Sequence, residues 1–481
     1  MNNEVILFSA VFIPTLGSFL LPVFGAFSVK VRNAAALVFV MCALACAALL
    51  IPVVSSGSVI SINYPMLLGI NFILSADMLA VFMAVAVLII GAVIVLYSFD
   101  YISYYENQNE YYLMVVLFLG SMMGLVFSGD LIFLFLFWEI TTIVCWRLIG
   151  FFREKNQVLR ADKAFLITVF GALMMLIGFV IIYNRTGSFD LAAIKAALKT
   201  DPVSNFAVFL ILIGLFSKSA TLPFHTWLPD AGVAPSPVTA LLHAAVLVKI
   251  GVYVYARLFI STMNVDVMWH TVIPVAAGIS TLVSAGAALV ETDIKRIIAY
   301  STISQIGFIF LGFSVGNEVG AAGALLYILT HGLAKGGLFL CAGIIEQNTG
   351  TKDIRKLGGL MKVMPVTALA FLFCAFSVMG IPPFGGFFGK YMVVRGAVEG
   401  GHPAVEYMFL AGAIMTVMYL LRAFTLVFLG ELKIDSKKEG SALMVFSVSL
   451  LAALSLASGI LVKYPLQFIH SAVLQMMGVP G

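Results

Sequence analysis

The sequence predicts an all-α polytopic membrane protein with about fourteen transmembrane helices. Of its 481 residues, 62% are hydrophobic and only 10% are charged, and the mean hydropathy is +1.09. A soluble domain usually carries about 25% charged residues, so this chain could not cover the surface of a water-soluble globule. Long apolar stretches recur from one end of the chain to the other. We therefore expect a single membrane domain over residues 1–481.

Fourteen apolar stretches are long enough to cross a bilayer, because a helix needs roughly 20 apolar residues to span a hydrocarbon core of about 30 Å. They lie near residues 5–27, 34–54, 72–97, 111–127, 130–149, 162–183, 203–222, 237–260, 270–290, 296–314, 319–345, 365–394, 405–429 and 441–462. We group them as helices 1–3 (residues 1–110), helices 4–8 (111–260), helices 9–13 (270–430), and helix 14 with a tail (441–481).

The distribution of Lys and Arg predicts the orientation of the chain. With an even number of spans, both termini lie on one side of the membrane. The loops on the other side hold fifteen of these cations, including Lys437 and Lys438, against five on the terminal side. Because cytoplasmic loops carry an excess of Lys and Arg, we expect both termini outside the cytoplasm, in the cell membrane of a prokaryote. The first span follows MNNE, which lacks the positive charge of a cleaved signal peptide.

Seven cations fall within the predicted spans, where a charge costs roughly 2.5–3.5 kcal/mol on insertion scales. Three are arginines near helix ends, from where a long side chain can reach the interface: Arg147, Arg257 and Arg422. The other four are lysines that this explanation does not cover: Lys218, Lys249, Lys335 and Lys390.

Only one acid lies well inside a predicted span, Glu139 in the segment LFLFWEITTI. Burial disfavours the charged form of a lysine, whereas a nearby carboxylate favours it. One carboxylate among several buried lysines makes a set of sites whose protonation is easily biased, as a proton carrier requires. The alternative is that these groups make structural hydrogen bonds between helices.

Two histidines accompany the buried lysines. His331 lies four residues before Lys335, and this spacing places both on one helix face. His243 lies six residues before Lys249, so a regular α-helix turns them about 240° apart. A neutral histidine can donate at one ring nitrogen and accept at the other, which suits a proton relay. The alternative is that both histidines only pack and hydrogen-bond.

Two lysine-bearing spans are interrupted by proline. Pro223 lies five residues beyond Lys218, and Pro382 and Pro383 lie upstream of Lys390. Proline removes a backbone donor and clashes with the preceding turn, so carbonyls are freed at membrane depth. A broken span in each half of the chain is typical of inverted-repeat transporters. Proline kinks without a function are also common in membrane helices.

No motif for a catalytic, metal or cofactor site is present. The five cysteines form no CxxC pair, which argues against zinc or iron–sulfur ligation. A Rossmann glycine pattern, a P-loop and HExxH are also missing from the sequence. The formal net charge of +4 is too small to indicate a nucleic-acid partner. We expect no cofactor in this chain.

Five segments resemble the proton-translocating antiporter-like subunits shared by respiratory complex I, energy-converting membrane hydrogenases and Mrp cation/proton antiporters. They are SGDLIFLFLFWEITT (128–142), KSATLPFHTWLPDAGVAPSPVTALLHAAVLVKIGVYVYAR (218–257), ETDIKRIIAYSTISQIGFI (291–309), LTHGLAKGGLFLCAG (329–343) and MGIPPFGGFFGKY (379–391). They occur in the order of the family, across roughly residues 75 to 430. The segment FWEITTIVCW (137–146) is more similar to hydrogenase and large Mrp subunits than to mitochondrial complex I.

The resemblance implies a fourteen-helix core with two inverted five-helix repeats, helices 4–8 and 9–13, in which helices 7 and 12 are broken. It also implies a role in proton translocation for seven residues, which match the family's positions on helices 5, 7, 8, 11 and 12: Glu139, Lys218, His243, Lys249, His331, Lys335 and Lys390. The chain ends about 19 residues after helix 14. It thus lacks the lateral helix of the distal complex I subunit and the extension of the largest Mrp subunit, which favours a middle-position or hydrogenase-type subunit.

Our leading hypothesis is a proton-translocating subunit of a redox-driven membrane complex, of the complex I (NADH-quinone oxidoreductase) or energy-converting hydrogenase type. Protons would approach Lys218 from the cytoplasm, cross through the central histidines and lysines, and leave through Lys390. This hypothesis implies other integral membrane subunits, a peripheral redox arm, and iron–sulfur clusters in partner subunits. The alternative is a subunit of a Mrp-type sodium/proton antiporter, which would use the same proton path. An inert scaffold fits poorly with a complete set of buried titratable groups, and an enzyme in its own right is disfavoured because the sequence has no cofactor motif.

Overall fold

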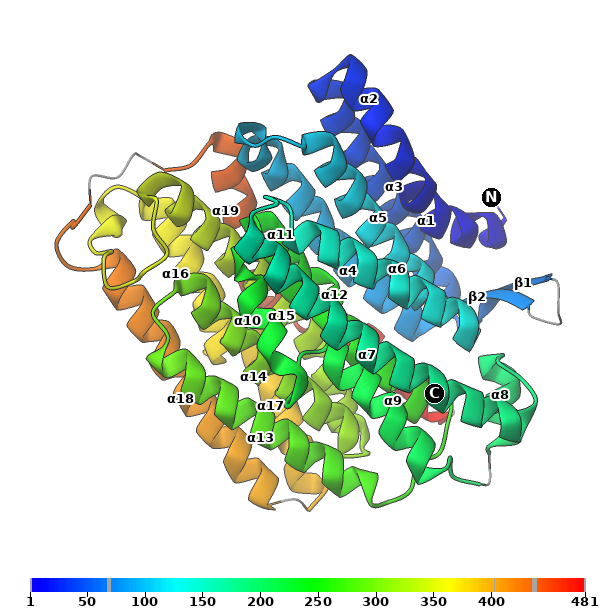
Figure 1. Ribbon diagram of the computed structural model, residues 1–481. Coiled ribbons are helices and arrows are strands. Elements are labelled where there is room, and N and C mark those ends of the chain that lie inside the picture. Colours follow the sequence, from blue (N-terminus) through cyan, green and yellow to red (C-terminus); the bar gives the residue numbers. More distant parts are fainter. Residues whose placement is uncertain (1, 67–70, 200, 402, 435–438, 480–481) are drawn as a thin grey trace.

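The computed structural model describes residues 2–66, 71–199, 201–401, 403–434 and 439–479, and most of them are helical (Figure 1). Within these residues, twelve helices are long and apolar enough to cross a membrane. Two shorter apolar helices, Asn205–Lys218 and Pro365–Met379, begin the spans predicted at 203–222 and 365–394. Together they account for the fourteen predicted spans, so the all-α polytopic fold is confirmed.

The first three spans differ from the prediction at one place. They are formed by α1 (Asn3–Gly17), η1 (Ser18–Leu20) and α2 (Leu21–Phe27), then α3 (Val29–Ser55), then α4 (Met78–Tyr101) with η3 (Ile102–Tyr104). Between α3 and α4 lies an antiparallel hairpin of β1 (Ile60–Pro65) and β2 (Asn71–Ala76). The predicted start of the third span at residue 72 is wrong, because the apolar residues of β2 pair with β1. Asp77 begins the helix instead, and its side chain accepts a hydrogen bond from the amide of Ala80 at 2.9 Å.

Helices 4–8 and helices 9–13 form two groups of five spans. The first group contains α5 (Gln108–Val126), α6 (Leu131–Ile149), α7 (Lys155–Thr186), α8 (Leu191–Ala197), α9 (Asn205–Lys218), η4 (Phe224–Thr226), α10 (Trp227–Asp230), η5 (Ala231–Val233), α11 (Ser236–Ala240), η6 (Leu241–Ala245), α12 (Leu247–Tyr255) and η7 (Ala256–Ile260). The second contains α13 (Trp269–Val290), α14 (Ile294–Ser314), α15 (Glu318–Thr349), η8 (Leu360–Lys362), α16 (Pro365–Met379), α17 (Gly385–Glu399) and α18 (Pro403–Phe428).

The two groups repeat one another in detail. α7 and α15 are both 32 residues long. Asp130 caps α6 and forms a β-bridge with Asp190, while Asp293 caps α14 and forms the corresponding bridge with Asp353. Because each group has an odd number of spans, the second group starts from the opposite face of the membrane. The repeats are therefore inverted, as the resemblance implies.

Spans 7 and 12 are broken at corresponding places. α9 is followed by Ala220 (φ 52°) and α16 by Gly380 (φ 83°), and a residue in this left-handed region ends a helix. Pro223 follows the first break, and Pro382 and Pro383 follow the second. The chain then continues as the short helices η4, α10 and η5 in span 7, and as α17 in span 12. The broken helices 7 and 12 of the predicted fold are present.

The loops divide between two faces. We call the face on which residue 2 lies the N-terminal face. The hairpin, the α5–α6 turn and the start of α8 lie together on it and line one cavity. The opposite face holds a cluster of loop cations, including Lys163, Arg296 and Lys352. Lys437 and Lys438, which entered the count of cations, lie outside the described residues.

The predicted tail after residue 462 is a helix. α19 (Ala442–Ile460) is followed by α20 (Lys463–Met477). The side-chain oxygen of Gln475 accepts a hydrogen bond from the amide of Met78 at 2.9 Å. The end of α20 therefore lies beside the start of α4, on the N-terminal face.

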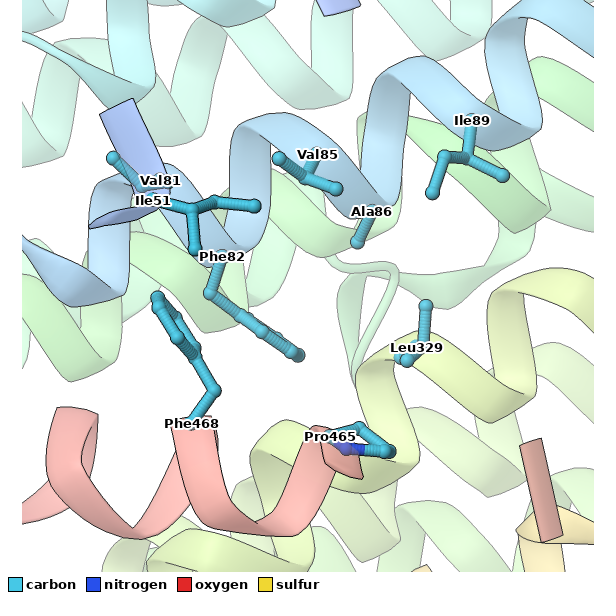
Figure 2. Close-up of a pocket in the computed structure, with 9 residues that line it drawn as sticks. All are labelled: Ile51, Val81, Phe82, Val85, Ala86, Ile89, Leu329, Pro465 and Phe468. Atoms are coloured by element: carbon cyan, nitrogen blue, oxygen red, sulfur yellow. The ribbon is translucent and has the colours of Figure 1, made fainter. Parts of the chain in front are cut away.

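An apolar cavity of about 180 Å³ separates part of α20 from α4 and α15. Figure 2 shows Pro465 and Phe468 of α20 facing Phe82 of α4 and Leu329 of α15 across it. All of the lining side chains are apolar. This cavity is therefore distinct from the charged residues described next.

Candidate functional site

The first half of the site joins α9 to α6. Lys218 is fully buried at the end of α9. Its Nζ donates to the hydroxyl of Thr142 at 2.6 Å and to the carbonyl oxygen of Trp138 at 3.1 Å. It also lies 5.1 Å from the centre of the Trp138 ring. The lysine is thus held by one turn of α6, the turn from Trp138 to Thr142 that also carries Glu139.

Glu139 lies on the same turn of α6 but forms no ion pair with Lys218. It is half-buried, and its Oε1 has no hydrogen-bond partner among the described residues. Because Lys218 instead binds a carbonyl and a hydroxyl, its charge is not locked by the carboxylate. Because Glu139 lies on the turn of α6 that binds Lys218, its carboxylate can bias the charge of the lysine without an ion pair.

The helix that carries His243 and Lys249 is not a regular α-helix. η6 (Leu241–Ala245) is a π-helical turn, and Val246 departs from helical geometry with φ −118° and ψ −74°. The predicted 240° between the two side chains is wrong, because that angle assumes an uninterrupted α-helix. Such π turns often occur at functional sites.

His243 and Lys249 both contact α15. The His243 ring lies 4.4 Å, between ring centres, from Phe339. The Nζ of Lys249 donates to the carbonyl oxygen of Ala244 and lies against Gly332, where an added Cβ would be 2.5 Å from it. The π turn thus brings both residues to the same neighbouring helix.

α15 provides the centre of the site. His331 and Lys335 are both buried on it, one turn apart. Neither ring nitrogen of His331 or of His243 has a hydrogen-bond partner among the described residues. Buried imidazole nitrogens usually find partners, so groups of this kind mark places where water or a mobile proton donor binds.

A chain of hydroxyl groups begins at Lys335. Its Nζ donates to the hydroxyl of Ser301 at 2.6 Å and to the carbonyl oxygen of Ile298 at 3.1 Å. The hydroxyl of Tyr419 donates to the same Ser301 oxygen at 2.8 Å and lies 3.2 Å from that of Thr416. α14, α15 and α18 are joined here by polar contacts within an apolar bundle.

Gln305 continues this network towards the second broken helix. Its amide nitrogen donates to Thr416 at 3.1 Å, and its side-chain oxygen accepts from the hydroxyl of Tyr327 at 2.6 Å. The Tyr327 ring lies 5.8 Å from the Nζ of Lys390. A polar network therefore connects Lys335 with the surroundings of Lys390.

Lys390 lies just beyond the break in span 12. Its Nζ donates to the carbonyl oxygen of Val378 at 2.7 Å and lies 4.7 Å from the centre of the Phe308 ring. Val378 is one of the last residues of α16, whose final carbonyls have no partner within the helix. The break therefore creates the acceptor that holds this lysine.

The polar residues that link the lysines are not predicted from the sequence. They are Thr142, Ser301, Gln305, Tyr327, Thr416 and Tyr419. A hydroxyl or amide in an apolar helix is individually unremarkable, and Ser or Thr hydroxyls usually bond to their own helix backbone. Only the crossing of α14, α15 and α18 identifies these residues as a network.

The three arginines near helix ends make specific contacts. Arg147 pairs with Glu110, Arg257 pairs with Asp77, and Arg422 donates to the carbonyl oxygen of Glu291 at 2.9 Å. The expected extension to the interface is thus replaced by binding to neighbouring helices and turns.

The turns on the opposite face are linked by ion pairs. Arg296 lies 2.8 Å from both Asp230 and Glu291. Burial alone would raise the pKa of Glu291, but hydrogen bonds from Arg296 and from the amides of Thr292 and Asp293 hold it below its usual value. These pairs connect the broken span 7 to the start of α14, and so connect the two repeats.

The sequence and the fold were compared with known proteins. Residues 128–418 match the family described as NADH:quinone oxidoreductase/Mrp antiporter, TM. The chain is 34% identical over 444 residues to the Na(+)/H(+) antiporter subunit A1 of Staphylococcus haemolyticus (strain JCSC1435), covering 85% of this chain and 55% of that protein. It is also 34% identical over 446 residues to the subunit A1 of Staphylococcus aureus (strain JH9), with the same coverage. The chain thus spans about half the length of the curated relatives it matches.

Two solved structures share the fold. A chain of the Mrp complex from Dietzia sp. DQ12-45-1b superimposes with a TM-score of 0.90 at 24% identity, covering 99% of this chain and 98% of that one. A chain of the membrane-bound sulfane sulfur reductase, an archaeal respiratory membrane complex, gives a TM-score of 0.90 at 23% identity, covering 98% of both chains. At these identities the two structures establish the shared fold alone.

The comparisons correct one prediction and support another. The leading hypothesis of a redox-driven complex of the NADH dehydrogenase or hydrogenase type is wrong. The curated relatives are Na(+)/H(+) antiporter subunits, and they favour the alternative, a subunit of a Mrp-type antiporter. The peripheral redox arm and the iron–sulfur clusters in partner subunits were expected only from that hypothesis, so neither is proposed for this protein. The family resemblance itself is confirmed, since its model covers more than half of the chain. This multi-pass membrane protein belongs to the NADH:quinone oxidoreductase/Mrp antiporter transmembrane family.

Proposed function

We propose that this chain is the proton-conducting subunit of a Mrp-type sodium/proton antiporter. The observation that carries the proposal is the row of four relay lysines and two histidines buried within the bundle, in a chain similar to Na(+)/H(+) antiporter subunits. The ring nitrogens of both histidines have no hydrogen-bond partner within the described part of the chain. Proton uptake occurs at Lys218, whose affinity Glu139 tunes. Protons then pass His243, Lys249, His331 and Lys335 with water between them, and leave through Lys390.

The polar network between Lys335 and Lys390 supports the last part of this path. Each hydroxyl can accept a hydrogen bond from one neighbour while donating to the next. The hydroxyl of Tyr419 lies within donating distance of both Ser301 and Thr416, so rotation of these hydroxyls could pass a proton along them. Gln305 cannot readily pass a proton, so its role is to hold Tyr327 and Thr416 in place.

Electrostatic energies are large enough to drive such a path. At an effective dielectric constant of about 20, two charges 4 Å apart interact by about 4 kcal/mol. Moving one charge against 100 mV costs about 2.3 kcal/mol. A change in the separation of Glu139 and Lys218 can therefore release or bind a proton against a membrane potential.

The setting of the proposed function follows from the same comparisons. The matched relatives are named as subunits, so we expect other integral membrane subunits as partners, in the cell membrane of a prokaryote. The N-terminal face is the outer face, because the opposite face holds most of the loop cations. The complex as a whole exchanges sodium for protons. No residue of this chain is proposed to bind or conduct sodium.

The proposal is tested in everted vesicles from cells that carry the complete operon with single substitutions in this chain. Lys218→Ala, Glu139→Ala and Lys390→Ala should each abolish sodium-driven proton flux in the absence of any electron donor, while the complex still assembles. Lys463→Ala, which removes an exposed lysine at the start of α20, is the matched control and should transport normally. Normal proton flux in all three variants would contradict the relay. A wild-type flux that requires an electron donor, or purified companions with iron–sulfur motifs, would contradict the antiporter.

A further inference from the structure

A polar cavity opens on the N-terminal face, away from Lys390. Its volume is about 280 Å³. Its walls come from the hairpin (Ser75), the α5–α6 turn (Ser128), the start of α8 (Asp190) and the end of η7 (Ser261). Hydroxyl and carboxylate groups in a space of this size can hold several water molecules. The residues of the proposed proton path, which we call the relay, do not line this cavity. They are Glu139, Lys218, His243, Lys249, His331, Lys335 and Lys390.

An ion pair forms part of the cavity wall. Both side chains are nearly buried, with 14% of Asp77 and 10% of Arg257 exposed. The guanidinium Nη2 of Arg257 lies 2.8 Å from a carboxylate oxygen of Asp77. A buried ion pair is costly, because its desolvation consumes most of the Coulomb attraction. The fold has therefore placed two charges where the cavity meets the apolar core, and the other charged groups on the wall, Asp190 and Lys195, are one of each sign.

A polar stripe connects this ion pair with the centre of the relay. Lys249 and Tyr253 are one turn apart on α12, and therefore share a face. The hydroxyl of Tyr253 accepts hydrogen bonds from Nε and Nη2 of Arg257 at 3.2 and 3.0 Å. From Lys249 to Arg257 the helix rises about 12 Å. The stripe thus covers the distance from the middle of the bundle to the cavity.

We propose that this cavity is the outer mouth of a second proton path, which leaves the relay at Lys249 and passes Tyr253 and the Asp77–Arg257 pair. The inference rests on the proposed function and adds an exit in the first repeat to the exit at Lys390 in the second. The ion pair acts as the gate. While Asp77 is bound to Arg257, the guanidinium compensates its carboxylate, which then takes up no proton. When water replaces Arg257 at the carboxylate, Asp77 can accept a proton and release it to the cavity.

Labelling after folding tests the path without disturbing the ion pair. Ser75→Cys places a thiol on the cavity wall by a nearly isosteric change. The complex is treated in right-side-out and in everted vesicles with two impermeant methanethiosulfonates of similar size, one carrying trimethylammonium and one carrying sulfonate. The cationic adduct, added from the outer side, should remove most of the sodium-driven proton flux, and the anionic adduct should remove less. A purely steric effect would be equal for both reagents.

Two controls and two substitutions complete the test. Val267→Cys lies on the same face outside the cavity, is 79% exposed, and should be labelled without effect. Asp77→Asn should lose most of the flux with the complex assembled, and Asp77→Glu should restore part of it. Full flux after complete cationic labelling, equal inhibition by both reagents, or labelling from the cytoplasmic side alone would overturn the inference. If the unlabelled wild type shows no sodium-driven proton flux, the proposed function is wrong, and this inference, which rests on it, is wrong as well.

Discussion

Each of the four lysines of the proposed proton path, Lys218, Lys249, Lys335 and Lys390, donates to a backbone carbonyl oxygen. The acceptors belong to Trp138, Ala244, Ile298 and Val378. A carbonyl can accept from an ammonium group or from a neutral amine, so these sites hold a lysine in either protonation state. A carboxylate partner would instead favour the charged form strongly. At the scale of single residues, the site is built to leave the lysine charge free to change.

Gly332 is the residue whose substitution tests this arrangement most directly. An added Cβ would lie 2.5 Å from the Nζ of Lys249 and 2.6 Å from Ile90, so Gly332→Ala must displace the lysine. We expect the variant to lose most of the proton flux at near-normal abundance, because an alanine in a helix interior is otherwise favourable by about 1 kcal/mol. Flux and the amount of assembled complex are measured in the same vesicles.

The neighbouring Gly336 supplies the control. An added Cβ there would be nearest to the end of the Leu451 side chain, at 3.2 Å, which can move, while Ile90 and Ala244 would lie at ordinary contact distances of 3.5 and 3.7 Å. Gly336→Ala should therefore transport normally. Equal loss of flux in both variants would indicate that tight helix packing, rather than the position of Lys249, is what matters on this face of α15.

At the scale of helices, α18 carries the polar contact that completes the second half of the site. The hydroxyl of Tyr419 joins Ser301 and Thr416. Tyr419→Phe removes this hydroxyl and keeps the ring, so stability should fall by only about 1 kcal/mol. We expect a clear decrease in proton flux with an unchanged apparent affinity for sodium. Sodium titrations of the flux separate the two parameters.

Tyr407 on the same helix is the comparison for Tyr419. It is 72% exposed and lies about three turns earlier, near the start of α18. Tyr407→Phe should leave the flux unchanged. A Tyr419→Phe variant with normal flux would show that the Ser301 and Thr416 hydroxyls are connected by water alone.

The helices differ in how far the sequence predicts them. Regular spans such as α13 and α14 match the predicted ranges closely, because hydropathy over about 20 residues is a strong signal. The hairpin before Asp77 is missed, since paired apolar strands and a helix start have the same hydropathy. The π turn at His243 is missed as well, because it depends on packing against α15 and changes no residue type. The four lysines could be predicted from their cost in an apolar span, whereas Gln305 and Tyr419 could not, since such residues are tolerated without a function.

At the scale of the whole molecule, the inverted repeats place one broken span on each side of the central helices. The first break follows Lys218 and the second precedes Lys390. At each break, the last carbonyl oxygens of the helix lack the hydrogen-bond donors that a continuous helix would have supplied. The duplication thus supplies two polar interruptions in the apolar core, one in each half, and the lysines of α12 and α15 lie between them in the chain.

The even number of spans makes a prediction about both termini. α20 ends beside the start of α4, and residue 2 lies on the same face, so the two termini share a side. The cation distribution predicts that this side is outside the cytoplasm.

Reporter fusions test this orientation. Alkaline phosphatase is active only after export, so a C-terminal fusion to it should be active. Green fluorescent protein that is exported in unfolded form does not fluoresce, so the corresponding fusion should be dark. The same reporters fused after Lys356, in the loop between α15 and α16, should give the reverse pattern, because an odd number of spans separates that loop from either terminus. A fluorescent C-terminal fusion with an inactive phosphatase fusion would show that the charge count is misleading here, and it would place the mouth beside Asp77 and Arg257 on the cytoplasmic side.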